Sequence, residues 1–307
     1  MRRFPVKLVI SVFLLLLIGG QMFGGTSSFA AQDQIQVVTS LELLADWVEA
    51  IGGPYVKVAS IIPGRTSPHH FEPSVKHLKM LQEADLYVEI GLDLEPWSNK
   101  LLKNVGNRQM TRLILSEKLP PACKYGSIEH QLGIRKHSQC NPHIWLDAPN
   151  VTQAISVITQ YLNQIYPEQA QYFTATGLSY LETVDTTFCR YKMRLKKSQH
   201  AGDLAVVTTV PTYTFLLRDL GVNEIGPLEK GHGSQPSAKQ VAELVAEAKA
   251  QKAVAVISEE GFDHGFGRIL AEETGLPLVY LAPLPEPGQS YLDFLENNLE
   301  KLTAVLE

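Results

Sequence analysis

Two histidines stand between two prolines in the segment SPHHFEP, residues 67–73. Histidine is the commonest metal ligand in proteins, and proline restricts the backbone on either side of the pair. Adjacent residues of an extended segment face opposite sides, so we expect His69 to face a site and His70 to point away from it. The segment indicates a fixed metal ligand; the alternative is a polar turn whose histidines face water.

A second Pro-His pair occurs in NPHIWLD, residues 141–147. It precedes an amphipathic stretch, as the first pair does. His143 is therefore either a second metal ligand or a histidine bonded to the backbone at the entry to a helix. Two such turns in one half of the chain favour the metal interpretation.

Two later loops also carry side chains that can bind metal. Each combines at least one carboxylate with an imidazole, in LEKGHGSQP (228–236) and SEEGFDHG (258–265). Zinc accepts nitrogen and oxygen ligands from such residues. The candidates for further ligands are Glu229, His232, Glu259, Asp263 and His264. The alternative is that they are solvated residues at the rim of a cleft.

Short apolar runs alternate with amphipathic stretches from residue 34 to about 115, and again after residue 200. This alternation predicts an α/β fold with two lobes, each a parallel sheet flanked by helices. Loops that leave the carboxyl ends of parallel strands meet at one edge, where ligands bind. We therefore expect the site in the cleft between the lobes.

The apolar residues between 167 and 197 recur at steps of three to five, which predicts a long, rigid helix that joins the lobes. The predicted division is a signal peptide at 1–30, an N-terminal lobe at 31–165, a connecting helix at 166–199 and a C-terminal lobe at 200–307. Such a connection limits hinge motion.

The N-terminus has a basic start, an apolar run and a small-residue exit, which predicts a signal peptide cleaved after Ala30. The mature protein is then exported to the periplasm. The net charge of −5, with acidic and basic residues mixed along the 307-residue chain, argues against a nucleic-acid partner. The sequence shows neither a complete nucleophile elbow nor a P-loop, so we predict that the protein is not an enzyme.

Three cysteines follow the signal peptide: Cys123, Cys140 and Cys189. The first two flank a polar loop, and an oxidising compartment favours a disulfide that closes it. Cys189 would be the unpaired thiol, which we expect to be buried in the long helix. The loop also holds His130 and His137, which either help to capture metal or are simply solvated.

These motifs resemble those of the zinc and manganese solute-binding proteins of bacterial ABC importers. The resemblance covers nearly all of the mature chain and is most specific in the two ordered Pro-His motifs. It implies that a divalent metal is held between two lobes by His69 and His143 and is delivered to a membrane permease. Zn²⁺ is the first expectation, with Mn²⁺ or Fe²⁺ next, and we expect a monomer.

The chain departs from that family at two ligand positions. By alignment, Val210 and Ala282 stand where relatives have a histidine or glutamate and an aspartate, and neither side chain can donate to a metal. Zinc takes four ligands, or three and a water. Three explanations stay open: other groups complete the site, the site is open to water or a small chelator, or metal binding is lost.

The predicted function is thus capture of a divalent transition metal for an ABC permease. Because both imidazoles must be neutral to bind, affinity should fall as the pH drops through about 6.5. The alternative is a binding protein of the same fold with a degenerate site, which takes a metal chelate or acts as an adhesin or partner module.

Overall fold

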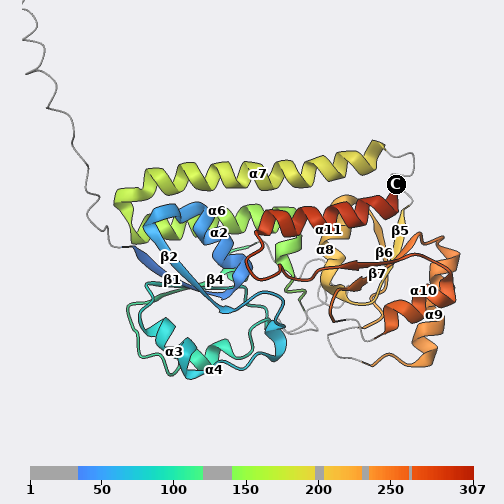
Figure 1. The fold of residues 1–307 in the computed structure, drawn as a ribbon, viewed down its shortest axis with the longest axis horizontal. Helices are drawn as coiled ribbons and strands as arrows, with labels where there is room; N and C mark the ends of the chain where they lie inside the picture. Colours follow the sequence, from blue (N-terminus) through green and yellow to red (C-terminus); the bar gives the residue numbers. More distant parts are fainter. Residues whose placement is uncertain (1–33, 120–139, 198–203, 230–234, 263–264) are drawn as a thin grey trace, which may run out of the picture. The chain divides into compact units, whose positions relative to one another are not determined.

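The computed structural model describes residues 34–119, 140–197, 204–229, 235–262 and 265–307 (Figure 1). Two parallel sheets organise this part of the chain, in the strand orders β2-β1-β3-β4 and β6-β5-β7-β8. The first sheet consists of β1 (Ile35–Leu41), β2 (Val56–Ile62), β3 (Leu86–Glu89) and β4 (Thr111–Ile114). The second consists of β5 (Ala205–Thr208), β6 (Asn223–Ile225), β7 (Ala255–Glu259) and β8 (Leu278–Leu281). The predicted fold class is confirmed, and the two lobes share one topology.

The first lobe alternates strand and helix. Its helices are α2 (Glu42–Gly52), α3 (Val75–Gln82), α4 (Ser98–Leu102) and α6 (Ala148–Ile165). In α2 the buried residues recur at helical spacing, and the helix packs on β1 and β2. Asp147 caps the start of α6, accepting a hydrogen bond from the backbone N–H of Asn150 at 3.3 Å.

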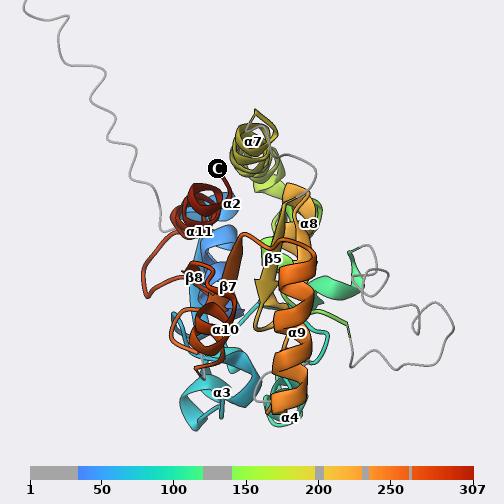
Figure 2. The same ribbon diagram turned by 90° about the vertical axis from the view of Figure 1, so that its right-hand side faces the viewer.

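The second lobe has helices on both faces of its sheet. They are α8 (Thr214–Leu220), α9 (Ala238–Ala250), α10 (Phe266–Thr274) and α11 (Tyr291–Leu306). Side chains alternate between the faces of each strand: Val207 and Val256 pack with α9 and α10, whereas Val206 and Ile257 belong to the main core. Figure 2 shows α9 and α10 together over these strands.

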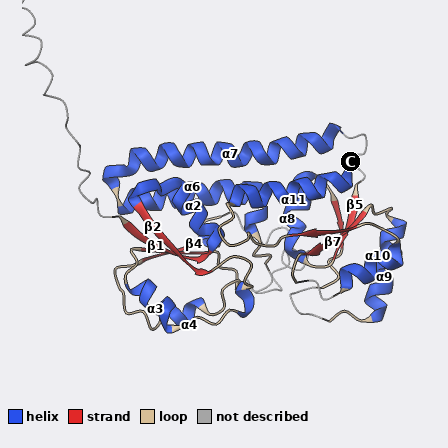
Figure 3. Cartoon of the chain, in the orientation of Figure 1, coloured by secondary structure: helices blue, strands red, loops and turns tan. Residues whose placement is uncertain are grey.

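The long helix α7 (Ala170–Lys197) packs against helices of both lobes, namely α2, α6, α8 and α11. It runs past both sheets in Figures 1 and 3. We predicted a helix from Pro167 to Lys197; the structure confirms it, with Pro167–Gln169 as an initial 3-10 turn. No described helix has both the length and the apolar character needed to cross a membrane.

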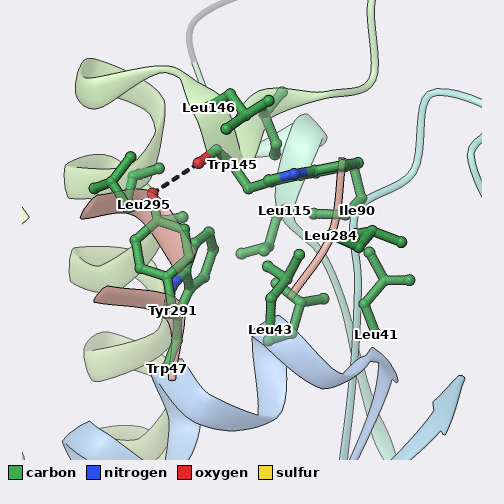
Figure 4. Close-up of a cluster of buried hydrophobic side chains, with 14 of the residues drawn as sticks. Leu41, Leu43, Trp47, Ile90, Leu115, Trp145, Leu146, Leu284, Tyr291 and Leu295 are labelled. Atoms are coloured by element: carbon green, nitrogen blue, oxygen red, sulfur yellow. Dashed lines mark hydrogen bonds between the residues drawn. The ribbon is translucent and has the colours of Figure 1, made fainter. Parts of the chain in front are cut away.

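The two lobes share one hydrophobic core. Tyr291 of α11 lies against Trp47 of α2, with ring centroids 5.1 Å apart, and its hydroxyl donates to the Trp145 carbonyl at 2.7 Å (Figure 4). The indole N–H of Trp145 in turn donates to the Pro283 carbonyl at 2.9 Å. Wide opening of the lobes would expose this apolar surface to water, which is unfavourable. The shared core therefore favours small relative movements.

Candidate metal centre

His69 lies in a 3-10 turn, Pro68–His70, that follows the carboxyl end of β2. Proline at the first position of the turn fixes its backbone. The His69 ring is half-buried, with its Nε2 atom shielded from solvent, whereas the next residue, His70, is exposed. The exposure of His70 agrees with the expectation that it points away from the site, but the pair lies in a 3-10 turn and not in the extended segment that we expected.

His143 lies just before the 3-10 turn Ile144–Leu146 that leads into α6, and only 4% of its surface is exposed. Its Nδ1 atom lies 2.6 Å from the side-chain oxygen of Asn141, whose amide nitrogen donates to the Pro211 carbonyl at 2.7 Å. Because an amide oxygen only accepts, Nδ1 must carry the proton. The lone pair of the neutral ring is then on Nε2, the atom that would bind a metal.

The rings of His69 and His143 lie next to each other, with centroids 6.1 Å apart and planes inclined by 60°. With Zn–N bonds of about 2.1 Å, two imidazoles on one zinc ion have centroids roughly 5–6 Å apart. The observed separation is at the upper end of this range. One ion can therefore contact both rings after a small movement.

Both histidines line a small pocket that also involves the second lobe. Its cavity volume is ≈ 30 Å³, enough for about two water molecules. The lining residues are Ser67, Pro68, His69, His143, Trp145, Glu259, Phe262, Pro283 and Leu284. Among the predicted candidates, the pocket thus brings together His69, His143 and Glu259.

Glu259 is the last residue of β7 and is 2% exposed. Burial raises its pKa to about 7; the Thr212 hydroxyl, which donates to the carboxylate, acts in the opposite direction, and the charge of Glu229 adds to the increase. A carboxylate held in such surroundings is destabilised in its charged form, and a cation in the pocket would reverse this. Its position and chemistry suit an oxygen ligand.

Glu229 follows β6 and is 3% exposed, but it is not among the residues that line the pocket. Its backbone N–H donates to the Thr209 carbonyl at 2.8 Å. The alternative interpretation, a solvated residue at the rim, is therefore excluded for Glu229 and Glu259, since both are buried.

Val210 and Ala282 lie where the strand-end rule places them, directly beyond β5 and β8. Both are buried, at 5% and 7% exposure, and neither lines the pocket. Ala282 is held through its backbone, which exchanges two 2.9 Å hydrogen bonds with the side chain of Asn298. These positions contribute packing, not metal donors.

Three candidates, His232, Asp263 and His264, lie outside the described residues. Within the described ranges, no group of three or more His, Cys, Asp or Glu side chains is arranged to hold a metal ion. Sequence reasoning missed Asn141 and Thr212, which orient His143 and Glu259. Thr212 and Glu259 lie 47 residues apart. Asn141 is only two residues from His143, but its amide is held by the Pro211 carbonyl, 70 residues away.

Of the cysteines, Cys123 lies outside the described residues, as do His130 and His137, so the pairing with Cys140 stays a prediction. Cys140 is buried. The expectation for Cys189 was wrong, since its free thiol is exposed on α7. The buried face of that helix runs through Val184, Phe188, Tyr191 and Leu195, and residue 189 falls outside this face.

A family model described as zinc-uptake complex component A, periplasmic (ZnuA), matches residues 37–305. The chain belongs to this family. It is therefore a metal-binding solute-binding protein of the ABC-importer type and not an enzyme. The resemblance inferred from the two Pro-His motifs is confirmed.

Curated ZnuA-family relatives share about a quarter of their residues with this chain. A putative metal-binding protein of Treponema pallidum is 24% identical over 276 residues, which cover 88% of this chain and 86% of the relative. The zinc-binding lipoprotein AdcA of Streptococcus pneumoniae is 24% identical over 282 residues, covering 89% of this chain. The chain spans only 56% of the length of AdcA.

Solved structures match the fold closely. A crystal structure of ZnuA superposes with a TM-score of 0.74 at 25% identity, covering 90% of this chain and all of that one. A laminin-binding adhesin (Lmb) from Streptococcus agalactiae gives 0.76 at 23% identity, covering 89% of this chain and 100% of that one. An Mn-bound periplasmic metal-binding protein from Candidatus Liberibacter asiaticus gives 0.75 at 21%, covering 88% and 99%. The last two show the fold alone.

Proposed function

We propose that this protein captures a single zinc ion with His69, His143 and Glu259 and delivers it to an ABC permease. Because the three side chains are not arranged around one point in this structure, a small movement of the lobes would bring Glu259 to the ion. The observation that carries the proposal is the pair of imidazoles, 6.1 Å apart, on one small pocket with a buried carboxylate. Two nitrogens and one oxygen are a ligand set that zinc accepts, with a fourth position for water or a further side chain. His232, Asp263 and His264 are the candidates for that side chain.

Zinc is preferred over manganese because of this donor set. Manganese favours oxygen-rich shells with more ligands, whereas imidazole suits zinc and iron. The proposed site has two imidazoles and one carboxylate. These donors therefore suit Fe²⁺ better than Mn²⁺. Zn²⁺ suits them as well, and it is the metal named in the description of the matched family.

A bare ion is favoured over a metal chelate by the size of the pocket. Pockets for organic ligands measure roughly 300–1,000 Å³, whereas the cavity volume here is ≈ 30 Å³. A chelating small molecule would require the lobes to separate, against the shared core of Trp47, Trp145 and Tyr291. The size of the pocket therefore supports a bare ion over the chelate alternative.

Export and delivery belong to the same proposal. Residues 1–30 would direct export to the periplasm and be removed after Ala30, and a bond between Cys123 and Cys140 would close the loop between them in that oxidising compartment. The monomer would release zinc to the permease by a small tilt of the lobes. The relatives known as zinc-binding proteins and the name of the family support this role.

A zinc titration of the mature protein against a chromophoric chelator tests the proposal. His69→Ala and His143→Ala should each weaken zinc binding by at least 100-fold, and Glu259→Gln by 10-fold or more, because each removes a ligand from the ion. His70→Ala, which changes the exposed neighbour of His69, is the matched control and should bind as the wild type does. Equal affinity in all five proteins would refute the site.

The pH dependence gives a second check. Zinc affinity should fall as the pH is lowered from 8 to 5, because protons compete for both imidazoles. A flat profile over that range would exclude histidine coordination. Elemental analysis of protein purified from its native compartment would identify the ion.

A further inference from the structure

The 3-10 turn that carries His69 is held by a residue from a different loop. The indole N–H of Trp97 donates to the Pro68 carbonyl at 3.1 Å. This carbonyl belongs to the peptide unit whose nitrogen is that of His69, and a peptide unit is planar. The Trp97 bond therefore restrains the plane that sets the backbone orientation of His69.

The same indole also contacts the residue on the other side of the histidine pair. The Trp97 ring lies edge-on against Phe71, with centroids 5.4 Å apart, and is 7% exposed. Trp97 thus contacts the turn both before and after His69. Ser67, the residue before this turn, makes no side-chain cap bond, and the Trp97 bond restrains the turn from another loop.

Trp97 is itself fixed by an unusual loop between β3 and α4. Three consecutive residues, Gly91, Leu92 and Asp93, have positive φ values of 84°, 56° and 60°. Non-glycine residues in this region are strained and persist only where their surroundings determine them. The strain at Leu92 and Asp93 indicates a loop whose shape is tightly specified.

The buried Glu95 supplies that specification. Its carboxylate accepts hydrogen bonds from the backbone N–H groups of Ile90 and Gly91, each at 3.0 Å, and from the Ser40 hydroxyl at 2.7 Å. The Glu95 carbonyl also accepts from the N–H of Ser98 at 3.0 Å, directly after Trp97. The indole therefore projects from a backbone anchored on both sides.

We propose that Trp97 is a positioning residue for His69: its indole N–H and ring hold the Pro68–His70 turn so that the imidazole faces His143. This inference rests on the proposed function, since it concerns the same zinc site. Trp97 restrains the backbone of His69, whereas Asn141 restrains the imidazole of His143 directly. Loss of an outer partner of a metal ligand typically costs 10- to 100-fold in affinity, and we expect the lower end of this range for a backbone restraint.

The test compares Trp97→Phe with Trp47→Phe. The first variant keeps an aromatic ring beside Phe71 but removes the donor to Pro68. The second removes an indole N–H that has no hydrogen-bond partner among the described residues, from a core residue that does not line the pocket. Zinc Kd, the apo thermal midpoint and the apo NMR signals of the His69 amide and ring would be measured for both.

We expect Trp97→Phe to weaken zinc binding by at least 10-fold and to shift the His69 signals, with the His143 signals unchanged. Trp47→Phe should alter the thermal midpoint while leaving the Kd and the His69 signals as in the wild type. A merely structural role of Trp97 would lower the midpoint alone. A zinc Kd within twofold of wild type in Trp97→Phe would overturn the proposal.

The two proposals can fail separately. If the wild type binds no zinc, the proposed function fails, and the apo NMR signals still decide the role of Trp97. In that case, shifted His69 signals in Trp97→Phe would support positioning of the turn, and unchanged signals would contradict it.

Discussion

Arg65 of the first lobe bridges two carboxylates of the second: its guanidinium lies 3.0 Å from Glu286 and 3.5 Å from Glu260. Arg65 precedes His69 by four residues, and Glu260 directly follows Glu259. Nearby, the carboxylate of Glu42 accepts from the backbone N–H of Gly64 in one lobe and of Gly288 in the other, the latter at 2.8 Å. These contacts join the loop of His69 to the second lobe beside the pocket.

Arg65→Met should accelerate zinc release several-fold with little change in the rate of zinc uptake. The exposed ion pairs contribute little to stability, about 0–1 kcal/mol, but they must separate when the lobes tilt. Stopped-flow mixing of the zinc-loaded protein with excess chelator measures the release rate. Salt should speed release from the wild type and not from the variant, because screening weakens exposed pairs.

Arg190→Met is the control for Arg65→Met. It removes an exposed pair with Glu296, between α7 and α11, away from the pocket. Its release rate should match that of the wild type. If Arg65→Met also released zinc at the wild-type rate, the contacts of Arg65 with Glu260 and Glu286 would not restrain zinc release.

Asn141→Ala should weaken zinc binding by 10- to 100-fold. The substitution removes the oxygen that holds the proton on His143 Nδ1 at 2.6 Å, so the ring can adopt the other tautomer and rotate. Asn163→Ala, which deletes an amide bonded to Thr174 between α6 and α7, is the matched control. Equal Kd values for the two variants, by chelator competition, would contradict a positioning role for Asn141.

Glu95 should make the free energy of unfolding fall as the pH rises. Burial, chiefly, and the charge of Glu89 raise its pKa to about 7 from about 4.5, so the folded state holds this proton more tightly than the unfolded state does. The resulting stability is fully present below about pH 4.5 and is lost as the pH rises towards 7, a change of roughly 3 kcal/mol at most. Urea denaturation of the apo protein at several pH values measures it.

Glu95→Gln should therefore reduce the fall in the free energy of unfolding between pH 5 and pH 8. The prediction concerns this difference and not the absolute stability of the variant at any single pH. Some slope should remain, because burial also raises the pKa values of Glu259 to about 7 and Asp147 to about 6. Glu182→Gln, at an exposed position on α7, should leave the slope as in the wild type. An undiminished slope in Glu95→Gln would exclude Glu95 as its source.

Gly177→Ala should destabilise the protein by about 1–3 kcal/mol through overpacking. A Cβ at this position in α7 would lie 2.4 Å from the hydroxyl oxygen of Thr159 in α6. Alanine is otherwise the better helix former by about 1 kcal/mol, so the sign of the change tests how closely the two helices pack. Urea denaturation should show that adding Thr159→Ala restores part of the lost free energy of unfolding. If Gly177→Ala alone were more stable than the wild type, the close contact between residues 177 and 159 would be contradicted.

The fold was predictable because its signals are local. Apolar runs at strand spacing, helical stretches between them and the periodic residues of α7 all follow from neighbouring residues in the chain. The placement of His69 and Glu259 followed less directly, from the rule that parallel strands end at one edge, and that of His143 from its repeated Pro-His motif. That rule places residues at an edge but does not say which side chains turn inward.

The residues that position the two histidines could not be predicted from the sequence, because the hydrogen bonds that hold them join residues far apart in the chain. Asn141 bonds to Pro211, and Trp97 to Pro68, and no local pattern marks either contact. The prediction that Cys189 is buried was wrong for a different reason. The periodicity of the apolar residues in α7 already placed residue 189 outside the buried face, which argues against its burial. For Val210 and Ala282, the missing donors were visible, whereas their roles in packing were not.

Anomalous diffraction at the zinc edge, from crystals of the mature protein grown with zinc, tests the central claim most directly. We predict one strong peak about 2.1 Å from a ring nitrogen of each of His69 and His143, with a carboxylate oxygen of Glu259 also bound. No peak between the two rings, or a zinc ion held elsewhere while the rings stay apart, would contradict the account.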